Sequence, residues 1–455
     1  MQRILAVTTA ALLVSMHGAG AERSHEDNDA TAATIDVVAL LAAAHGAPPL
    51  ICALAAQTVR GWGWGDWNDV PATPLGDASA SLRSSDSRDA KFADADVARL
   101  LAGLASDDAC VRELSVRLLG SQRSDVVTRE LVTRLKASDA PMREVAAMGL
   151  GFMAPATALD PLVGVLHDAS PNVRANAAWA LGRIDNGRAL APVVALFADN
   201  VPRVREAAVI AAGHIDSSST TAALLRVLQN DDAPSVRRVA AWALGQREAR
   251  EAAPALAQQL DRERDDRVRE MIVWALGNSG ARTGVSAISS ALRKDSNDAV
   301  RETAAWALGE LHDATGVDAL AAAVNDDRSM RVRGTAAWAL GQLHSRDMKV
   351  PSGLVKLLKD DSDDVRLKAA WSLGQVGEPS ALNEIRDALK VEKSSSVRRA
   401  LIRALVKSGG RSEESLSELL KSEDATVREA AVRGLVGNES FNPWPWPWPR
   451  PRPFP

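Results

Sequence analysis

A Val-Arg pair, once replaced by Met-Arg, recurs along most of this chain at a nearly constant spacing. Neighbouring pairs are 30 to 33 residues apart. A fixed period of this length is typical of units that cannot bury their apolar face alone and therefore stack on their neighbours. We therefore expect a repeat array rather than one globule. The pairs begin at Val111, Met142, Val173, Val204, Val236, Val268, Val300, Val332, Val365, Val397 and Val427.

One period has room for two short helices. Arg188 to Asp199 carries apolar residues at helical spacing, and Arg203 to Ile215 does so again after a short turn. In the second helices a glycine follows the apolar stripe and suits a left-handed helix end. These glycines are Gly182, Gly245, Gly277, Gly309, Gly341 and Gly374. Prolines at positions 171, 202 and 234 suit a first turn. Each period is thus predicted to be a helical hairpin.

The second helices resemble a known family of repeats. They read VRANAAWALG, VRRVAAWALG, VREMIVWALG, VRETAAWALG, VRGTAAWAL and VRLKAAWSLG. This is similar to the bacterial HEAT-like repeats of the phycobilin-lyase (PBS lyase) type. The resemblance implies an all-α solenoid of the ARM/HEAT type, with about eleven two-helix repeats. Such arrays serve as scaffolds, chaperone-like lyases, nucleic-acid enzymes and a metal-dependent hydroxylase, so the resemblance says little about function.

The first residues look like a signal peptide. Met1–Arg3 is positively charged, Ile4–Val14 is apolar, and Ala19–Ala21 fits a cleavage site. The apolar run is shorter than the ~20 residues of a membrane span. We expect residues 1–21 to be removed and the protein to be exported, periplasmic or secreted; the alternative is a helix of the mature fold.

The mature chain divides by composition into four parts. Residues 22–60 contain a polar start and an N-terminal helical hairpin, and residues 61–93 form a linker rich in Trp, Gly and Ser. The repeat array occupies residues 94–440, and residues 441–455 are a low-complexity tail of Trp, Pro and Arg.

The chain has two cysteines, Cys52 and Cys110. An oxidising compartment would allow them to pair. We favour two separate buried thiols, because a sequence cannot show that their Cα atoms come within bonding range. A catalytic thiol is disfavoured, since neither lies in a recognisable catalytic motif.

Charge and motifs argue against several classes of function. The net charge is −4 with Lys and Arg dispersed among Asp and Glu, which does not favour nucleic acid. The common metalloprotease, phosphate-loop, serine-hydrolase and Cys-x-x-Cys motifs are missing from the sequence. The hydroxylase branch of the family uses His-Glu pairs at the start of second helices to hold iron. This chain has pairs such as Arg143-Glu144 and Arg269-Glu270 there, and arginine cannot be a ligand. We predict no catalytic residues, no metal and no cofactor.

The repeated arginines are interpreted as structural. An acidic residue, for example Asp199 or Asp327, usually stands about five positions before the valine of a pair. Each arginine could therefore reach an aspartate of a neighbouring turn and fix the register between hairpins. Pairs of this kind on the surface would contribute only ~0–1 kcal/mol each.

A row of tryptophans is the main candidate for a binding site. Each one lies five residues after a repeat arginine and borders the apolar stripe. They are Trp179, Trp242, Trp274, Trp306, Trp338 and Trp371. Two interpretations stay open. The indoles either pack against the next repeat or form an exposed ladder on the concave face for an extended peptide or glycan.

The tail reads PWPWPWPRPRPFP and cannot form a helix, because every second residue lacks an amide proton. Its candidate contact residues are Trp444, Trp446, Trp448, Arg450 and Arg452. The alternatives are weak peripheral membrane contact, docking into a protein groove, including that of its own array, and an end without a role. Two arginines are few for a lipid-binding patch.

These observations favour a non-enzymatic envelope scaffold or adaptor that binds an extended segment of a protein partner on the concave face of the array. The alternative is an accessory or chaperone-like factor that acts on a client protein, as the lyase-type resemblance implies. The sequence identifies neither the partner nor the oligomeric state.

Overall fold

A computed structural model describes residues 36–48, 52, 92–122, 124–215, 220–343, 351–377 and 379–408, with a few positions between 417 and 432. All regular structure in these ranges is helical, which confirms the predicted all-α solenoid. The chain divides between Ala223 and Leu224 into two compact units, which are described separately. The predicted signal peptide, nearly all of the 61–93 linker and the 441–455 tail lie outside the described residues.

The repeats are helical hairpins, as predicted. The first unit contains α2 (Val37–Ala44), α4 (Asp94–Gly103), α5 (Ala109–Gly120), α6 (Asp125–Arg134), α7 (Ala140–Met153), α8 (Leu159–Gly164), α9 (Pro171–Ile184), α10 (Leu190–Ala195) and α11 (Pro202–His214). The second contains most of α12 (Thr220–Asn230), then α13 (Pro234–Gln246), α14 (Ala253–Leu260), α15 (Asp266–Asn278), α16 (Val285–Lys294), α17 (Asp298–Glu310), α18 (Val317–Asp326), α19 (Met330–Gln342), α20 (Ser352–Lys356), α21 (Asp363–Val376), α22 (Leu382–Val391) and α23 (Ser395–Lys407).

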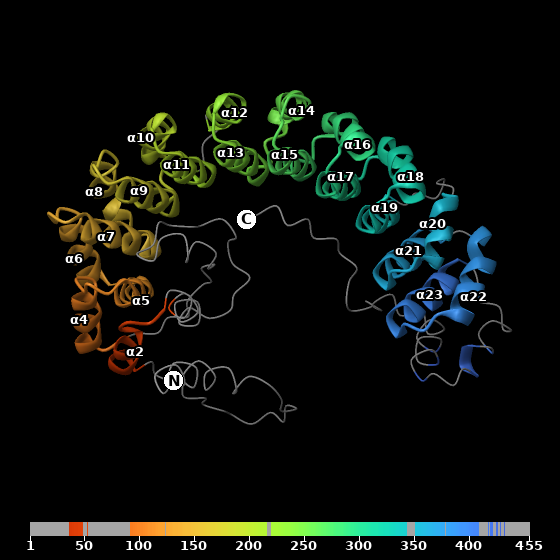
Figure 1. Ribbon diagram of the computed structural model, residues 1–455, viewed down its shortest axis with the longest axis horizontal. Helices are drawn as coiled ribbons and strands as arrows, with labels where there is room; N and C mark the ends of the chain where they lie inside the picture. Colours follow the sequence, from red (N-terminus) through yellow and green to blue (C-terminus); the bar gives the residue numbers. More distant parts are fainter. Residues whose placement is uncertain are drawn as a thin grey trace. The chain divides into compact units, whose positions relative to one another are not determined.

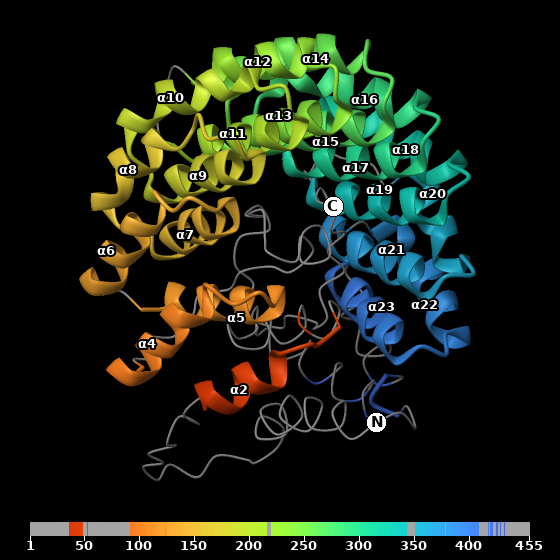
Figure 2. The ribbon, with the colours of Figure 1, turned by 60° about the vertical axis from the view of Figure 1, so that its left-hand side comes forward.

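The two helices of each hairpin form two layers. Within each unit the second helices, which carry odd numbers from α5 to α23, lie on the inner side of the curve, and the first helices lie outside (Figures 1 and 2). Successive second helices contact one another along each unit, as α15 does with α13 and α17. The inner layer therefore carries the residues that follow each Val-Arg pair.

The starts of the second helices follow the predicted signals. α9, α11 and α13 begin at Pro171, Pro202 and Pro234, where a missing amide proton leaves no hydrogen bond unmade. α15 is capped instead by Asp265, whose side chain accepts from the backbone N–H groups of Arg267 and Val268. The residues around the repeated Val-Arg pair thus determine where each inner helix begins.

The predicted ends of these helices were wrong. Glycines such as Gly182 and Gly245 lie inside the helices, and the left-handed residue comes three positions later. Among the described residues that follow inner helices, the positions with positive φ are Ala154, Asp185, Glu248, Gly280, His312 and Gly377. Most of these residues are not glycine, so the left-handed conformation at the helix end does not explain why glycine recurs in the motif. Its role is in packing between helices.

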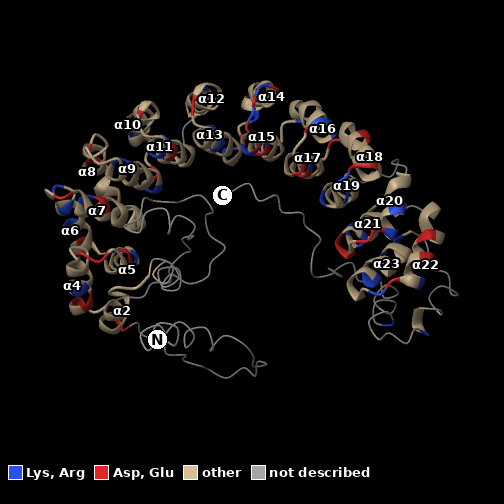
Figure 3. Ribbon diagram, in the orientation of Figure 1, with Lys and Arg blue, Asp and Glu red and all other residues tan. Residues whose placement is uncertain are grey.

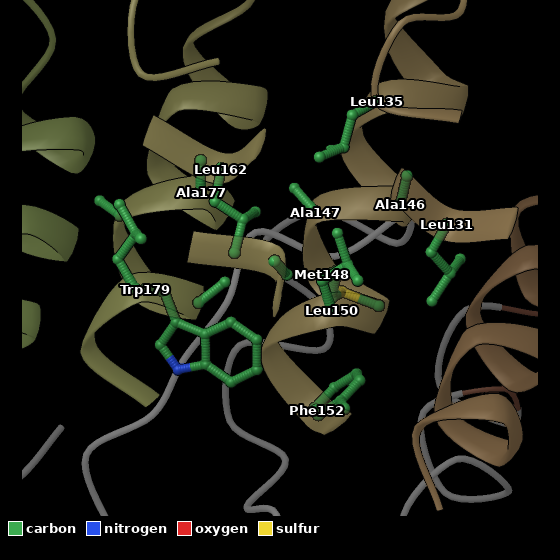
Figure 4. Packing of buried hydrophobic residues seen from close by; sticks show 14 of the residues in the cluster. Leu131, Leu135, Ala146, Ala147, Met148, Leu150, Phe152, Leu162, Ala177 and Trp179 are labelled. Carbon is green, nitrogen blue, oxygen red and sulfur yellow. The ribbon is translucent and has the colours of Figure 1, made fainter. Parts of the chain in front are cut away.

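The core lies between the two layers and continues from repeat to repeat. In the first unit Ala146 and Ala177 of the inner helices have no exposed surface, and Leu131 and Leu162 of the outer helices pack in the same cluster. Figure 4 shows these side chains packed between neighbouring helices. Alanine on the inner helices permits close approach, and leucine on the outer helices fills the remaining volume.

The N-terminal end of the array is covered by α2. This helix contacts α4 and α5. Cys52 and Cys110 form a disulfide with a Cα–Cα distance of 5.6 Å, so the prediction of two separate thiols was wrong. The cysteines come together where α2 packs on α4 and α5, a tertiary contact that no local sequence pattern predicts. Around the disulfide, Ala44, Val111 and Leu114 form a small apolar cluster.

Candidate functional site

The tryptophans of the inner helices are mostly buried. Trp179, Trp242, Trp274, Trp338 and Trp371 are 3%, 2%, 8%, 1% and 6% exposed. Trp306 alone among the six keeps an intermediate exposure. The interpretation as an exposed ladder is therefore wrong for five of the six side chains. Packing against the neighbouring repeat, which the sequence left open, is what the structure shows.

The cause of this burial is the glycine of the preceding inner helix. A Cβ added to Gly245 of α13 would lie 2.5 Å from Cζ3 of Trp274 on α15. Gly309 stands in the same relation to Trp338, at 2.9 Å, and Gly341 to Trp371, at 2.6 Å. Real Cβ atoms do not come so close, so each indole occupies the space that a side chain would take.

The first unit repeats this arrangement with an additional aromatic ring. A Cβ on Gly151 of α7 would collide with the indole of Trp179 on α9. Phe152 meets the same indole edge-on, with ring centroids 5.2 Å apart. Figure 4 shows Trp179 directed toward the helix that carries Met148, Leu150 and Phe152. The tryptophan position thus joins consecutive repeats in both units.

The repeat arginines form a ladder of ion pairs between consecutive repeats. Arg301 of α17 donates to both carboxylate oxygens of Asp327 in the next repeat, at 2.7 and 3.0 Å. Its third nitrogen donates to the backbone oxygen of Asp295, at 3.0 Å. The same bidentate pairing joins Arg143 to Asp168, Arg174 to Asp199, Arg237 to Glu263, Arg269 to Asp295 and Arg366 to Glu392, and Arg333 reaches Asp360.

The predicted pairing is confirmed, but the pairs lie deeper than expected. The side chains of Arg301 and Asp327 are only 6% and 8% exposed. The hydrogen bond from Arg143 holds the pKa of Asp168 below its ordinary value of 3.8, against the opposing effect of burial. Each guanidinium forms hydrogen bonds with groups of two consecutive repeats. The ladder therefore fixes the register between repeats, and its arginines are not available to bind a ligand.

A second row lies one residue after the repeat arginines. On α7 Glu144 accepts from Asn172 of α9 at 3.2 Å. On α15 Glu270 lies 3.4 Å from the hydroxyl of Thr303 on α17. On α17 Glu302 pairs with Arg331 of α19. In the sequence this row corresponds to the glutamates of the Arg-Glu pairs.

These carboxylates are poorly hydrated. Burial raises the pKa of Glu144 and of Glu270 above 4.5, and the nearby carboxylate of Glu302 raises that of Glu270 further, against the hydrogen bond from Thr303. Burial likewise raises the pKa of Glu310 near the end of α17. The ladder acids accept hydrogen bonds from an arginine, whereas Glu270 accepts one from the hydroxyl of Thr303 and is attracted by Arg331 without a hydrogen bond to it, so its charge is compensated less.

Four side chains of α17 form a stripe that reaches the surface. Asp298, Glu302, Trp306 and Glu310 follow one another at intervals of four residues, so they lie on successive turns of one side of the helix. Trp306 is the incompletely buried member of the tryptophan row. We call these four residues, with Asp266 and Glu270 of α15, the acidic stripe. Figure 3 shows acidic residues on both inner helices.

Hollows on the surface follow the ladder. One of about 490 Å³ lies beside Arg301 and Asp327, and others of about 440 and 460 Å³ lie beside Arg174 and Arg269. They are lined by turn residues and ladder ion pairs. Within the described residues no group of three or more His, Cys, Asp and Glu could hold a metal ion. Nor does any helix of those ranges have the length and apolar character needed to cross a membrane.

Comparison with known families matches this repeat. The model of HEAT repeats matches residues 128–213, 159–245, 194–277, 285–352 and 350–436, which together cover more than half of the chain. The chain belongs to the HEAT-repeat family. The finer resemblance to the lyase-type HEAT repeats rests on the sequence motif alone. The comparison with curated proteins finds no match.

The chain is similar to several solved structures, of which importin beta supports the HEAT-type fold. Importin beta is similar with a TM-score of 0.53 and 15% identity over 74% of this chain and 59% of importin beta. Kap121p bound to Pho4p has a TM-score of 0.49 and 15% identity over 94% of this chain, which spans 53% of Kap121p. An engineered protein has 22% identity and a TM-score of 0.38 over 75% of this chain and 98% of its own. At these identities the likeness concerns the fold alone.

The tail residues predicted to make contacts, Trp444, Trp446, Trp448, Arg450 and Arg452, lie outside the described residues of this HEAT-repeat chain.

The inner helices carry two different rows of side chains. Five of the six tryptophans are buried between repeats, whereas Glu144, Glu270 and Glu302 are only partly buried and also contact the next inner helix.

Proposed function

We propose that this HEAT-repeat protein is a non-enzymatic scaffold or adaptor of the bacterial envelope, which holds an extended segment of a partner protein against its inner helices. The charged start and apolar run of residues 1–14 support export. The Cys52–Cys110 disulfide supports it independently, since disulfides persist in oxidising compartments.

The observation that carries the proposal is the acidic stripe. Glu270 and Glu310 are partly buried carboxylates whose pKa values are raised because they have lost hydration. A lysine or arginine side chain from a partner would restore the lost stabilisation of these charges. Trp306, one turn from both Glu302 and Glu310, adds a flat apolar surface. The stripe therefore fits a segment with basic and apolar or aromatic side chains.

In this proposal the acidic stripe, and not the row of tryptophans, supplies the binding energy. The scaffold hypothesis from sequence relied on six tryptophan anchors, and five of these are buried in contacts between repeats. Replacing Trp274 or Trp338 would therefore damage the array and could not distinguish binding from folding. Variants at the acidic stripe change partly exposed positions and reduce that difficulty. Because Glu302 pairs with Arg331 and Glu270 contacts Thr303, the fold of each variant is verified by circular dichroism before capture.

The test is crosslinked capture from the native envelope fraction. We compare the mature protein with Glu270→Gln/Glu302→Gln and with Trp306→Ala. The matched control is Asp318→Asn/Glu384→Gln, which removes two charges from exposed positions on the outer helices α18 and α22. Partner recovery should fall by about tenfold for the stripe variants, should be unchanged in the control, and should weaken with salt. Equal recovery by all variants would contradict the proposal.

A variant that lacks residues 442–455 separates two roles of the tail. Loss of the partner would make the tail a contact of its own, whereas increased recovery would indicate that the tail competes for the stripe. The alternative of a chaperone-like factor predicts a different result: the protein would suppress aggregation of unrelated denatured proteins, and capture would return many clients with no dominant partner.

A further inference from the structure

The N-terminal end of the array has an apolar face that α2 covers. Val37 of α2 is 1% exposed and belongs to the same core cluster as Leu100 of α4. At the other end of α2, Ala44 packs in the cluster that contains Val111 and Leu114 of α5. An isolated helix of eight residues is not stable in water. The position of α2 therefore depends on how it is attached.

One attachment is a single carboxylate at the start of α5. Asp108 Oδ1 accepts the backbone N–H groups of Cys110 and Val111, at 2.8 and 3.2 Å, and so caps the helix. Asp108 Oδ2 accepts the backbone N–H of Gly46 at 2.7 Å. Gly46 has a φ of +70°, which turns the chain after α2 toward α5. The side chain of Asp108 thus binds both the start of α5 and the segment that follows α2.

The second attachment is the disulfide. Cys110 is the second residue of α5, two positions after Asp108, which caps this helix. The backbone N–H of Cys52 donates to the backbone oxygen of Pro48, at 3.0 Å. The disulfide joins positions 58 residues apart, so without it a long stretch of chain separates α2 from the array.

We propose that the Cys52–Cys110 disulfide is a latch that closes the N-terminal end of the array in an oxidising compartment, and that in the reduced chain α2 detaches from α4 and α5. The latch closes by thiol–disulfide exchange. The two thiols lose two protons and two electrons to the disulfide of a protein oxidant, which leaves as a dithiol. In this proposal α2 is therefore fixed over the N-terminal end of the array only after export.

Once closed, the latch is protected. Cys52 is 0% and Cys110 is 3% exposed, so an attacking thiolate has no path to either sulfur while α2 is in place. Reduction requires α2 to move first. In the open state Leu100 and Leu114, each 0% exposed here, become accessible at the end of the array.

Hydrogen exchange measured by mass spectrometry tests the latch. The mature protein is compared with Cys52→Ser/Cys110→Ser at neutral pH without denaturant. Peptides that cover Val37–Ala44 and Ala109–Gly120 should exchange at least about tenfold faster in the variant. Those from Asp266–Asn278 in the other unit serve as the internal control and should not change. Unchanged exchange at Val37–Ala44 would overturn the proposal.

Thiol accessibility provides a second readout that does not depend on the serine variant folding. The wild-type chain is produced with its signal peptide for export and without it in the cytosol, and each sample is treated with a maleimide under native conditions. The cytosolic chain should react at both cysteines, and the exported chain at neither until denatured and reduced. Cytosolic protein with both thiols present but shielded would show that α2 stays docked without the latch.

Discussion

Gly245 of α13 and Trp274 of α15 share one site in the structure, because the indole fills the place that a Cβ on the glycine would occupy, 2.5 Å from its Cζ3 atom. The relation recurs along the second unit at the glycine and tryptophan of consecutive inner helices. It explains why a glycine recurs in the last turn of these helices, although alanine favours a helix by about 1 kcal/mol relative to glycine.

Gly245→Ala should therefore destabilise the protein, although alanine favours helix. The new methyl group meets the indole and the backbone of Ala275, which cannot give way, and we expect a loss of about 1–3 kcal/mol. Gly164→Ala is the matched control, because nothing lies within 4 Å of a Cβ there, at the end of α8. Urea unfolding should show the control unchanged or stabilised; equal effects at both positions would refute the packing explanation.

Replacement of the buried tryptophans should affect stability before binding. Trp338→Ala removes a side chain that is 1% exposed, with an expected loss of about 3–5 kcal/mol. Trp306→Ala removes a partly exposed ring and should cost clearly less. Denaturant unfolding followed by circular dichroism measures both, and equal losses would mean that Trp306 contributes as much to the core as Trp338 does.

The ladder makes a quantitative prediction at Arg301. Arg301→Ala leaves the nearly buried carboxylate of Asp327 without its cation and should cost about 3 kcal/mol or more. Lysine cannot bridge both carboxylate oxygens and the Asp295 carbonyl, so Arg301→Lys should recover only part of this loss. Lys390→Ala breaks an ion pair with Asp387 in which both side chains are more than 60% exposed, and it should change stability by less than about 1 kcal/mol.

The ladder also predicts loss of stability in acid. The pKa of Asp168 is lowered from 3.8 by the hydrogen bond from Arg143; those of Glu263 and Glu392 fall from 4.5 through their arginines, against burial. Carboxyls with depressed values stabilise the folded state above their ordinary pKa, and this stability is lost as the pH falls through the lowered values. Glu144 and Glu270, with raised values, act in the opposite sense and offset part of the effect.

We therefore expect the free energy of unfolding to decline below about pH 4. Asp168→Asn removes one of the titrating groups, so this variant should be less stable at neutral pH and should lose less stability between neutral and acid pH. Thermal unfolding of both proteins across that range measures the two slopes. Parallel curves for wild type and variant would show that the Arg143–Asp168 pair contributes nothing to the acid sensitivity.

The local features of this chain were determined by sequence alone. The period of the Val-Arg pair, the prolines of the first turns and the helical spacing of apolar residues predicted the hairpins, because these signals act within one or two turns of helix. The arginine and its acid also repeat in register, so their pairing followed from the period. The absence of a single globular core followed from the same observation.

Only the tertiary structure decided which faces of the inner helices are buried. Trp274 and Glu270 lie one turn apart on the same helix, yet the indole enters the space above Gly245 while the carboxylate reaches the surface. The burial of Trp274 depends on the missing side chain of Gly245, about 30 positions away in the sequence. In the same way, the disulfide of Cys52 depends on the distant residue Cys110. Sequence periodicity reports the face of one helix, whereas burial requires knowing what the next helix places against it.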